Sequence, residues 1–324
     1  MLSVALAFAG PGDFHMIKTG TALAAGICLS FALANPASAL NTRTWVSGAG
    51  VDQAGCGPIA NPCRTLQYAH DTTAAGGEID VKDSAGYGAL TITKGITIIA
   101  NGVTAGVLAA PSSNGIFLLG NTNDRIHLQG LTIEGSGVGY NGIVLNAGSI
   151  LTIVSCVVRG FTNVGIALYP SANARISISD TTISANAKQG IYYAGSQSSQ
   201  VSLVATRLLI DDNETGIDLT PTNGSLNAEI GDTIVSHNSQ KGIQVQGNTY
   251  AIIDNSRMIR NQYGLRVVSS AVVFLRRSTV FGNTVAGVDV GSGATGYSYR
   301  DNSIHANATD ISPTPAALQT AQPQ

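Results

Sequence analysis

Seven aromatic, amide or charged side chains recur at intervals in the second half of the chain, and together they could form a sugar-binding site. They are Tyr169, Tyr192, Asp218, Gln244, Gln246, Arg266 and Asp289. A tyrosine ring can take the apolar face of a pyranose, while amides and carboxylates bond to its hydroxyls. If the chain cleaves polysaccharide, Arg266 and Asp218 are the candidate catalytic residues.

These residues follow glycines that are themselves periodic. A glycine followed by an aliphatic residue occurs seven times, at steps of 23, 25, 26, 26, 22 and 23 residues; the glycines are Gly142, Gly165, Gly190, Gly216, Gly242, Gly264 and Gly287. The three residues after each glycine read aliphatic, variable, apolar, which is the period of two of a β-strand. This repeat length predicts a solenoid whose units stack on one another.

A second pattern lies upstream of the glycines: an apolar residue, another five positions later, and an asparagine three positions after that. Examples are Ile178-Ile183-Asn186, Ile230-Val235-Asn238, Ile253-Met258-Asn261, Leu275-Val280-Asn283, Tyr299-Ile304-Asn307 and, more weakly, Ala205-Ile210-Asn213. Two patterns at one spacing indicate several strands per turn, with asparagines stacked at a corner. Asparagine suits a corner because it tolerates unusual backbone angles and its amide can bond to the next one, about 4.8 Å along. Leucine-rich repeats fit worse, since they need a leucine-rich consensus.

On these glycines and asparagines, the chain resembles the right-handed parallel β-helix proteins of the pectin-lyase-like superfamily, from about Gly76 to Ile311. The resemblance implies an all-β fold: a right-handed, single-stranded parallel β-helix of roughly nine or ten coils over residues 76–311. It also implies that the seven side chains share one surface, because in catalytic relatives the strand after the glycine floors the substrate cleft. It implies no one activity, since the superfamily includes polysaccharide lyases, glycoside hydrolases, epimerases, phage tailspikes and inert surface proteins.

Stacking of coils fixes which candidate residues can meet. Tyr169 and Tyr192 should lie on adjacent coils and face solvent, with ring centres about 5 to 7 Å apart. Asp218 and Asp289 should be three coils, roughly 14 Å, apart, whereas glycosidase carboxylates lie about 5 to 9.5 Å apart. Arg266 should pair with Asp289 one coil away. Alternate residues should point inward as a core column of Leu145, Leu168, Tyr193, Leu219, Val245, Val267 and Val290.

Other acidic groups and the histidines add no second site. Asp211-Asp212 resembles the paired aspartates of polygalacturonases, but the Asn-Thr-Asp, Gly-His-Gly and Arg-Ile-Lys motifs of that family are absent, so the pair is interpreted as a turn. No histidine shares a column with a cysteine or a second histidine at ligand spacing, so we expect no metal site. We expect no cofactor either; calcium would be required only by a lyase, and the outward face has few carboxylates for it.

A second charged column has a structural interpretation. The position two places after the first apolar residue of a coil is charged in several coils, and the charges alternate in sign. These residues include Asp180, Arg207, Asp232, Arg277 and Asp301. We expect Asp180, Arg207 and Asp232 to pair between coils, and Arg277 to pair with Asp301. Such pairs would disfavour slipped stacking.

The charge content of the chain indicates which classes of partner it is expected to bind. Charged residues make up 11% of the chain, against a usual figure of about 25%, and the net charge is −2. Without a basic face and stacking aromatics beside it, binding of nucleic acid is not expected. The expected partner is a polysaccharide or surface glycan; the oligomeric state is not indicated.

Residues 1–39 are expected to be a secretory signal peptide, with translation starting at Met1 or at Met16. Met16-Ile17-Lys18 gives a basic start, residues 22–33 an apolar run, and Ala37-Ser38-Ala39 a small-residue cleavage site. A transmembrane anchor is the alternative, but no other segment approaches the roughly 20 apolar residues of a span. We therefore expect a secreted or periplasmic protein without a membrane span.

Residues 40–75 are expected to cap the first coil, whose interior would otherwise be exposed. They contain a short helix near residues 64–71 and a turn-rich loop with Cys56 and Cys63. In an oxidising compartment we expect these cysteines to form a disulfide, with two free thiols as the alternative. The segment also resembles the N-terminal cap of many exported bacterial β-helix proteins. Residues 312–324 are polar and proline-rich and are expected to be a disordered tail.

The sequence thus predicts an exported β-helix protein that binds polysaccharide or cell-envelope glycan without cleaving it. A polysaccharide lyase or glycoside hydrolase acting on the same outward face is one alternative. A structural or adhesin-like surface protein is the other.

Overall fold

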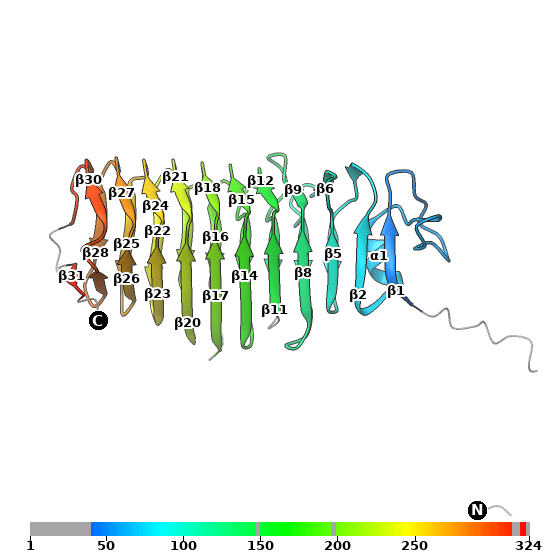
Figure 1. Cartoon of the computed structure of the whole chain (residues 1–324), viewed down its shortest axis with the longest axis horizontal. Helices are drawn as coiled ribbons and strands as arrows, with labels where there is room; N and C mark the ends of the chain where they lie inside the picture. The colour runs from blue at the N-terminus through cyan, green and yellow to red at the C-terminus, as the bar shows by residue number, and fades with distance from the viewer. Residues whose placement is uncertain (1–39, 147–149, 196–198, 313–317, 322–324) are drawn as a thin grey trace, which may run out of the picture. The chain divides into compact units, whose positions relative to one another are not determined.

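The computed structural model describes residues 40–146, 150–195, 199–312 and 318–321, so the expected signal peptide lies outside the described residues. Within these ranges the chain is a parallel β-solenoid, in which three sheets run along a stack of coils (Figure 1). One described helix, α1 (Leu66–Thr72), lies at the N-terminal end. The all-β solenoid expected from the glycine and asparagine patterns is confirmed.

Sheet A faces the viewer in Figure 1. Its twelve described strands, in spatial order, are β1 (Asn41–Val46), β2 (Thr73–Val81), β5 (Ile96–Ile99), β8 (Arg125–Gln129), β11 (Ile150–Val154), β14 (Ala174–Ser179), β17 (Gln200–Thr206), β20 (Ser225–Gly231), β23 (Thr249–Asp254), β26 (Val272–Arg276), β29 (Thr295–Ser298) and β31 (Gln319–Thr320).

Sheets B and C complete each coil. The ten described strands of sheet B are β3 (Ala85–Gly86), β6 (Ala105–Leu108), β9 (Leu131–Glu134), β12 (Val157–Arg159), β15 (Thr182–Ser184), β18 (Leu209–Asp211), β21 (Ile234–Ser236), β24 (Arg257–Ile259), β27 (Thr279–Phe281) and β30 (Ser303–His305). The nine of sheet C are β4 (Leu90–Ile92), β7 (Ile116–Leu118), β10 (Ile143–Leu145), β13 (Ile166–Leu168), β16 (Gln189–Tyr193), β19 (Thr215–Leu219), β22 (Lys241–Gln246), β25 (Tyr263–Val268) and β28 (Ala286–Val290).

Each coil passes through sheet C, then sheet A, then sheet B. From β10 to β28, residues at equivalent repeat positions pair in parallel on neighbouring strands of sheet C. The predicted inward column is confirmed, because all seven of its side chains are at most 1% exposed. Burial of these apolar side chains supplies the main favourable term in folding.

The periodic glycines are required by the stacking of the coils. A Cβ atom on Gly216 would lie 2.6 Å from the backbone oxygen of Gly242, and one on Gly242 would lie 2.6 Å from that of Gly264. These distances are shorter than any ordinary carbon–oxygen contact. The glycine before each sheet C strand therefore lets one coil approach the next closely enough to pair.

The predicted asparagine ladder forms the corner between sheets B and C. Along this corner one side-chain amide after another donates to the asparagine of the next coil, from Asn186 through Asn213, Asn238, Asn261 and Asn283 to Asn307. The positive φ belongs to the residue before the asparagine, with values of 56° at Asp212 and 51° at His237. The expectation that asparagine is used for its backbone tolerance is therefore wrong; its amide, bonded within a buried corner, is what the site requires.

The corner between sheets A and B carries the second charged column. Arg207 donates to both carboxylate oxygens of Asp180, at 2.6 and 2.7 Å, as expected. The expected pair of Arg277 with Asp301 is wrong, since Arg277 Nε donates to Asp254 Oδ1 at 2.9 Å. The Arg277 side chain reaches back to the end of β23, where Asp254 also pairs with Arg276.

The N-terminal end contains the expected disulfide between Cys56 and Cys63, whose Cα atoms lie 5.0 Å apart. The expected helix is α1, and the hydroxyl of Thr65 caps it by accepting the backbone N–H of Tyr68 at 3.2 Å. Strand β2 follows α1 directly and pairs with β1, so both strands extend sheet A.

Part of the expected disordered tail is ordered. Gln319 and Thr320 pair with Tyr297 and Ser298, and Leu318 packs against the core. The unpaired edge of β29 provides backbone groups that this segment satisfies. Residues 313–317 and 322–324 lie outside the described residues.

Candidate functional site

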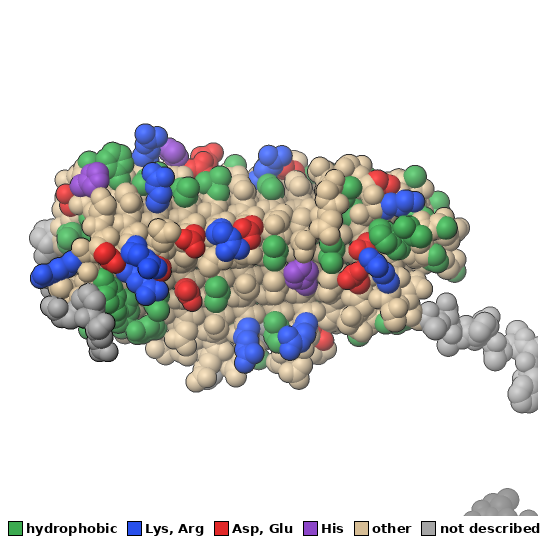
Figure 2. Space-filling model, viewed as in Figure 1, with side chains coloured by type: hydrophobic (Ala, Val, Ile, Leu, Met, Phe, Trp, Pro, Cys, Tyr) green, Lys and Arg blue, Asp and Glu red, His purple; other side chains and the backbone are tan. Residues whose placement is uncertain are grey.

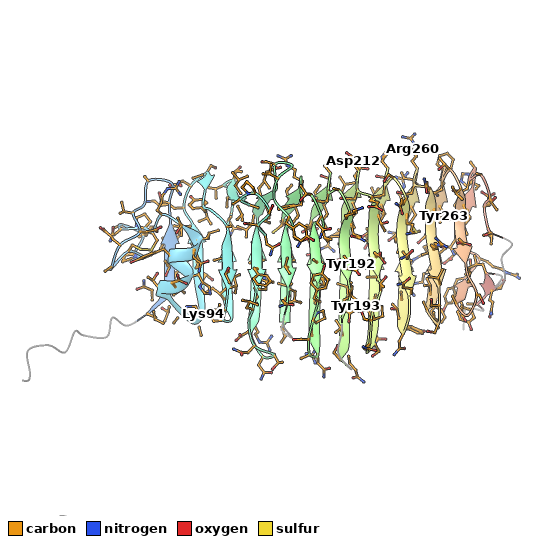
Figure 3. All side chains as sticks on the ribbon, turned by 180° about the vertical axis from the view of Figure 1, so that it is seen from behind. Lys94, Tyr192, Tyr193, Asp212, Arg260 and Tyr263 are labelled. Carbon is orange, nitrogen blue, oxygen red and sulfur yellow. A yellow bond between two sulfur atoms is a disulfide. The ribbon has the colours of Figure 1, made fainter. Side chains whose placement is uncertain are left out.

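All seven residues of the predicted site lie on the outward face of sheet C. Tyr192, Asp218, Gln244, Arg266 and Asp289 are in register on five successive strands, from β16 to β28. Gln246 ends β22 and Tyr169 directly follows β13. Figure 3 shows the solenoid from behind, with Tyr192 and Tyr263 labelled on these strands. The alternation of side chains along each strand places this column outward.

The aromatic end of this face is a pair of tyrosines. The rings of Tyr169 and Tyr192 meet in a T shape, with centroids 5.9 Å apart and planes at 78°. The separation agrees with the expected range for adjacent coils. Both rings are half-buried rather than fully exposed, and burial is the main cause that raises the pKa of both hydroxyls. The phenols are therefore neutral at neutral pH.

The two rings pack against an apolar cluster outside the solenoid core. Its buried members, Val144, Val164 and Ala167, are at most 5% exposed, although Val144 and Ala167 belong to the outward column. Phe117 on β7 lies in register with Val144 and packs against the cluster. Phe117 was not predicted as part of this face, although Gly115-Ile116-Phe117-Leu118 carries the glycine pattern one coil earlier.

The centre of the face is a hydrogen-bonded carboxylate. Asp218 Oδ1 accepts the Thr220 hydroxyl at 2.5 Å and the Gln244 side-chain amide at 3.1 Å. The Asp218 residue is only 7% exposed. Two neutral donors on one oxygen fix the orientation of the carboxylate.

The charged end of the face is an ion pair. Arg266 Nε lies 3.2 Å from Asp289 Oδ2, as expected, and the guanidinium lies over the ring of Tyr263, 5.2 Å from its centroid. Before these strands, Lys188 Nζ lies 2.8 Å from Glu214 Oε2, and the Gln240 amide donates to Glu214 Oε1 at 2.6 Å. These polar side chains were not predicted as part of the face. They lie at the corner before the strands and do not follow the alternation of side chains along a strand.

The geometry gives little support to the two candidate catalytic residues. Asp218 and Asp289 are separated by β22 and β25, so they are three strand spacings, roughly 14 Å, apart. Glycosidase carboxylates lie about 5 to 9.5 Å apart. The guanidinium of Arg266 is engaged by the carboxylate of Asp289 and by the ring of Tyr263.

Asp211 and Asp212 lie elsewhere, at the corner that follows sheet B. Asp211 Oδ1 accepts the Ser236 hydroxyl at 2.6 Å and lies 2.9 Å from His237 Nδ1. Asp212 has a positive φ of 56°, as a turn residue. This agrees with the interpretation of the pair as a turn.

Two further findings concern the described residues as a set. Within the described ranges, no three His, Cys, Asp or Glu side chains converge closely enough to hold a metal ion. The one helix among the described residues, α1, is too short and too polar to cross a bilayer.

Solved structures that resemble this chain include a pectate lyase, Pel9A, at 14% identity and a TM-score of 0.46, over 87% of this chain and 78% of the other. The A-module of mannuronan C-5 epimerase AlgE6 from Azotobacter vinelandii aligns at 13% identity and a TM-score of 0.44, over 80% of this chain and 95% of the module. A rhamnogalacturonan lyase aligns at 13% identity and a TM-score of 0.37, over 79% and 72%. No curated protein matches the sequence.

The family comparison covers most of the chain. The model of the right-handed β-helix region matches residues 70–224 and 198–312. These ranges include every strand of the candidate face. The chain therefore belongs to the right-handed β-helix family.

Proposed function

We propose that the outward face of sheet C binds a polysaccharide or cell-envelope glycan without cleaving it. The observation that carries this proposal is the Tyr169–Tyr192 pair, at 5.9 Å, beside the Asp218–Gln244 hydrogen bond on the following coils. An apolar platform next to fixed polar groups is the arrangement by which proteins take the two sides of a sugar ring.

The T shape of the tyrosine pair supports this role. In a T-shaped pair one ring directs its edge at the other, so its own two faces are not covered by its partner. The apolar cluster beneath holds the rings in place, which reduces the entropy lost when a ligand binds. Gln244 and Gln246, both half-buried on β22, provide amide groups for sugar hydroxyls.

Binding without cleavage is favoured by the separation of the carboxylates and by the ion pair of Arg266. Export to a secreted or periplasmic location is supported by the Cys56–Cys63 disulfide, since such bonds persist in oxidising compartments.

The test is a glycan array with the wild type, Tyr192→Ala and Tyr250→Ala, followed by calorimetric titration of the glycans that bind. Tyr192→Ala should weaken binding by roughly 1 to 2 kcal/mol, as loss of an aromatic anchor does. Tyr250→Ala is the matched control, because Tyr250 is an exposed tyrosine on sheet A, 46% exposed. Equal binding by Tyr192→Ala and the wild type would contradict the proposal.

A product assay separates the two alternatives. The mature chain is incubated with uronate and neutral polysaccharides, with and without calcium. Release of shorter chains would establish a lyase or hydrolase and overturn the non-cleaving role. Absence of both binding and products would favour a structural or adhesin-like protein.

A further inference from the structure

Four asparagines of this chain are followed directly by a glycine, and they lie in different environments. They are Asn101, Asn114, Asn141 and Asn223. A glycine has no side chain to shield its backbone nitrogen, so this nitrogen can reach the amide carbon of the preceding asparagine where the backbone is free to turn. The amide is then lost as ammonia and a carboxylate takes its place. The surroundings of each pair decide whether this happens in the folded protein.

Two of the four pairs are held inside the stack of coils. The N–H of Gly115 donates to the backbone oxygen of Asn141 at 2.9 Å, and the N–H of Gly142 donates to that of Val164 at 3.0 Å. The side-chain amide of Asn141 is fixed as well, because it donates to Asn114 Oδ1 at 3.0 Å. A bonded glycine nitrogen cannot turn toward the asparagine before it without breaking a contact between coils.

Asn223 lies in an exposed turn before β20, but the backbone around it is bonded to neighbouring coils. The N–H of Asn223 donates to the backbone oxygen of Gly195 at 3.3 Å, and the backbone oxygen of Gly224 accepts the Asn248 amide at 3.1 Å. These bonds restrain the turn. We therefore expect Asn223 to react more slowly than an asparagine in a turn without them.

The turn between β5 and β6 is less restrained. Asn101 and Gly102 are both exposed, and none of the described residues accepts the N–H of Gly102. Gly102 has a φ of 70°, and a Cβ atom added to it would meet no atom within 4 Å. The turn borders a hollow of about 470 Å³ whose described lining residues carry no charge, and Figure 2 shows this part of the surface mostly in tan. The backbone here has room for the extra carbon of an isoaspartate.

The neighbouring coil places a hydrogen-bond donor on the amide of Asn101. Gln129 Nε2 donates to Asn101 Oδ1 at 2.9 Å. Gln129 Oε1 lies 3.1 Å from His127 Nε2, and this contact fixes which end of the Gln129 amide faces Asn101. Negative charge develops on Asn101 Oδ1 when a nucleophile attacks the amide carbon, and a donor already in place stabilises that state.

We propose that Asn101 is a self-modification site, at which the folded protein converts asparagine to aspartate and isoaspartate with the assistance of Gln129. The backbone nitrogen of Gly102 loses its proton and attacks Asn101 Cγ, which forms the new Cγ–N bond of a cyclic imide. The bond from Cγ to Nδ2 breaks, and ammonia leaves with that proton. One water molecule then opens the imide at either carbonyl. The product places a carboxylate in a hollow whose described lining was uncharged.

The test follows the mature chain at mildly alkaline pH, once folded and once unfolded in urea. Peptide mass spectrometry locates each conversion of an amide to a carboxylate, and anion-exchange chromatography separates the more acidic product. In urea the four asparagines should react at similar rates, because the same residue follows each of them. In the folded protein Asn101 should react fastest, and Asn114 and Asn141 should react roughly tenfold or more slowly than in urea, because their coils must open first.

Two variants test the assistance by Gln129. Gln129→Met removes the donor without adding a charge, and it should slow the reaction of folded Asn101 about fivefold, as loss of one neutral hydrogen bond does. The rate in urea should stay the same. Gln262→Met, at an exposed glutamine before β25, is the matched control and should leave both rates unchanged. Thermal unfolding shows that each variant is folded.

The comparison of the four asparagines uses the unmodified sequence, so it stands even if a variant is unstable. A faster reaction at Asn114, Asn141 or Asn223 than at Asn101 in the folded protein would overturn the proposal. An unchanged rate at Asn101 in folded Gln129→Met would overturn the role of Gln129.

Discussion

The aromatic clusters on the outward faces of sheets A and C are built differently. On sheet C, Tyr169 and Tyr192 meet edge to face, with planes at 78°. On sheet A, Phe274 stacks on Tyr297 with centroids 4.8 Å apart and planes at 21°, and Tyr250 packs against it from the preceding coil at 5.1 Å. The spacing of the stacked rings is close to the spacing of the strands.

Ring geometry and neighbouring groups separate a packing role from a binding role. The faces of Phe274 are covered by rings of its own chain, so this column joins three successive coils near the C-terminal end. The tyrosine pair on sheet C leaves one ring uncovered by its partner and has the Asp218–Gln244 hydrogen bond beside it. We therefore expect loss of stability from one cluster and loss of binding from the other.

The largest expected effect lies in the core beneath both clusters. Leu219→Asp places an unpaired charge at a position that is 0% exposed, and it should destabilise the fold by several kcal/mol. Thermal unfolding followed by circular dichroism measures it. Gln246→Asp, at a half-buried outward position, is the control and should shift the midpoint far less. Equal midpoints would mean that inward and outward positions are exchanged.

The next largest effect is a loss of stability that should differ between the two aromatic clusters. Phe274→Ala should lower the free energy of unfolding by about 2 kcal/mol, because the half-buried ring contacts Tyr250, Tyr297 and Tyr299. Tyr192→Ala should cost less, about 1 kcal/mol, since it loses one ring contact. Urea denaturation measures both. A larger loss for Tyr192→Ala would reverse the roles assigned to the two clusters.

The sequence predicted the solenoid because each coil must satisfy the same local constraints. A Cβ on Gly216 would meet the backbone of the next coil, and Asn213 must bond to Asn238, so neither residue type can be replaced freely. These constraints repeat once per coil and are visible as periods. Strand β31, formed by Gln319 and Thr320, does not recur in each coil, because it pairs with the free edge of β29, and no periodic pattern could indicate it.

Acidification should cause a smaller loss of stability, and this loss arises at His70, outside both aromatic clusters. His70 Nε2 accepts the backbone N–H of Thr93 at 3.3 Å, and Nδ1 lies 2.9 Å from Asp71 Oδ1. Burial is the main cause that lowers the pKa of His70; the bond to Asp71 opposes it and Lys94 adds to it. Below the unfolded-state pKa of about 6.5, the unfolded chain binds a proton at His70 that the folded chain does not bind. The free energy of unfolding therefore decreases as the pH falls from that value toward the lower folded-state pKa.

Denaturation at a series of pH values measures this loss. His70→Gln should flatten the profile between the unfolded and the lower folded pKa. Phe274→Ala and Tyr192→Ala should keep the wild-type slope, because neither ring touches the cap. An unchanged slope in His70→Gln would show that another group is responsible.

The candidate site could be predicted only in part. The outward column follows from strand alternation, so Tyr192, Asp218 and Gln244 were placed together correctly. Burial of that column was not predictable, because it depends on how side chains from different coils cover one another. Val164, in the corner before β13, contributes to the apolar cluster without following the strand period.

The smallest effect separates the two clusters most sharply, and double-mutant cycles measure it. Aromatic pairs contribute about 0.5 to 1.5 kcal/mol beyond area burial, so Tyr169/Tyr192 and Phe274/Tyr297 should each show a coupling of that size in unfolding. In calorimetric binding of a glycan selected on the array, only the sheet C pair should couple, because only those rings meet the ligand. Binding coupling at Phe274/Tyr297 would move the sugar platform to sheet A. Coupling in unfolding but not in binding at both pairs would leave both clusters with a packing role alone.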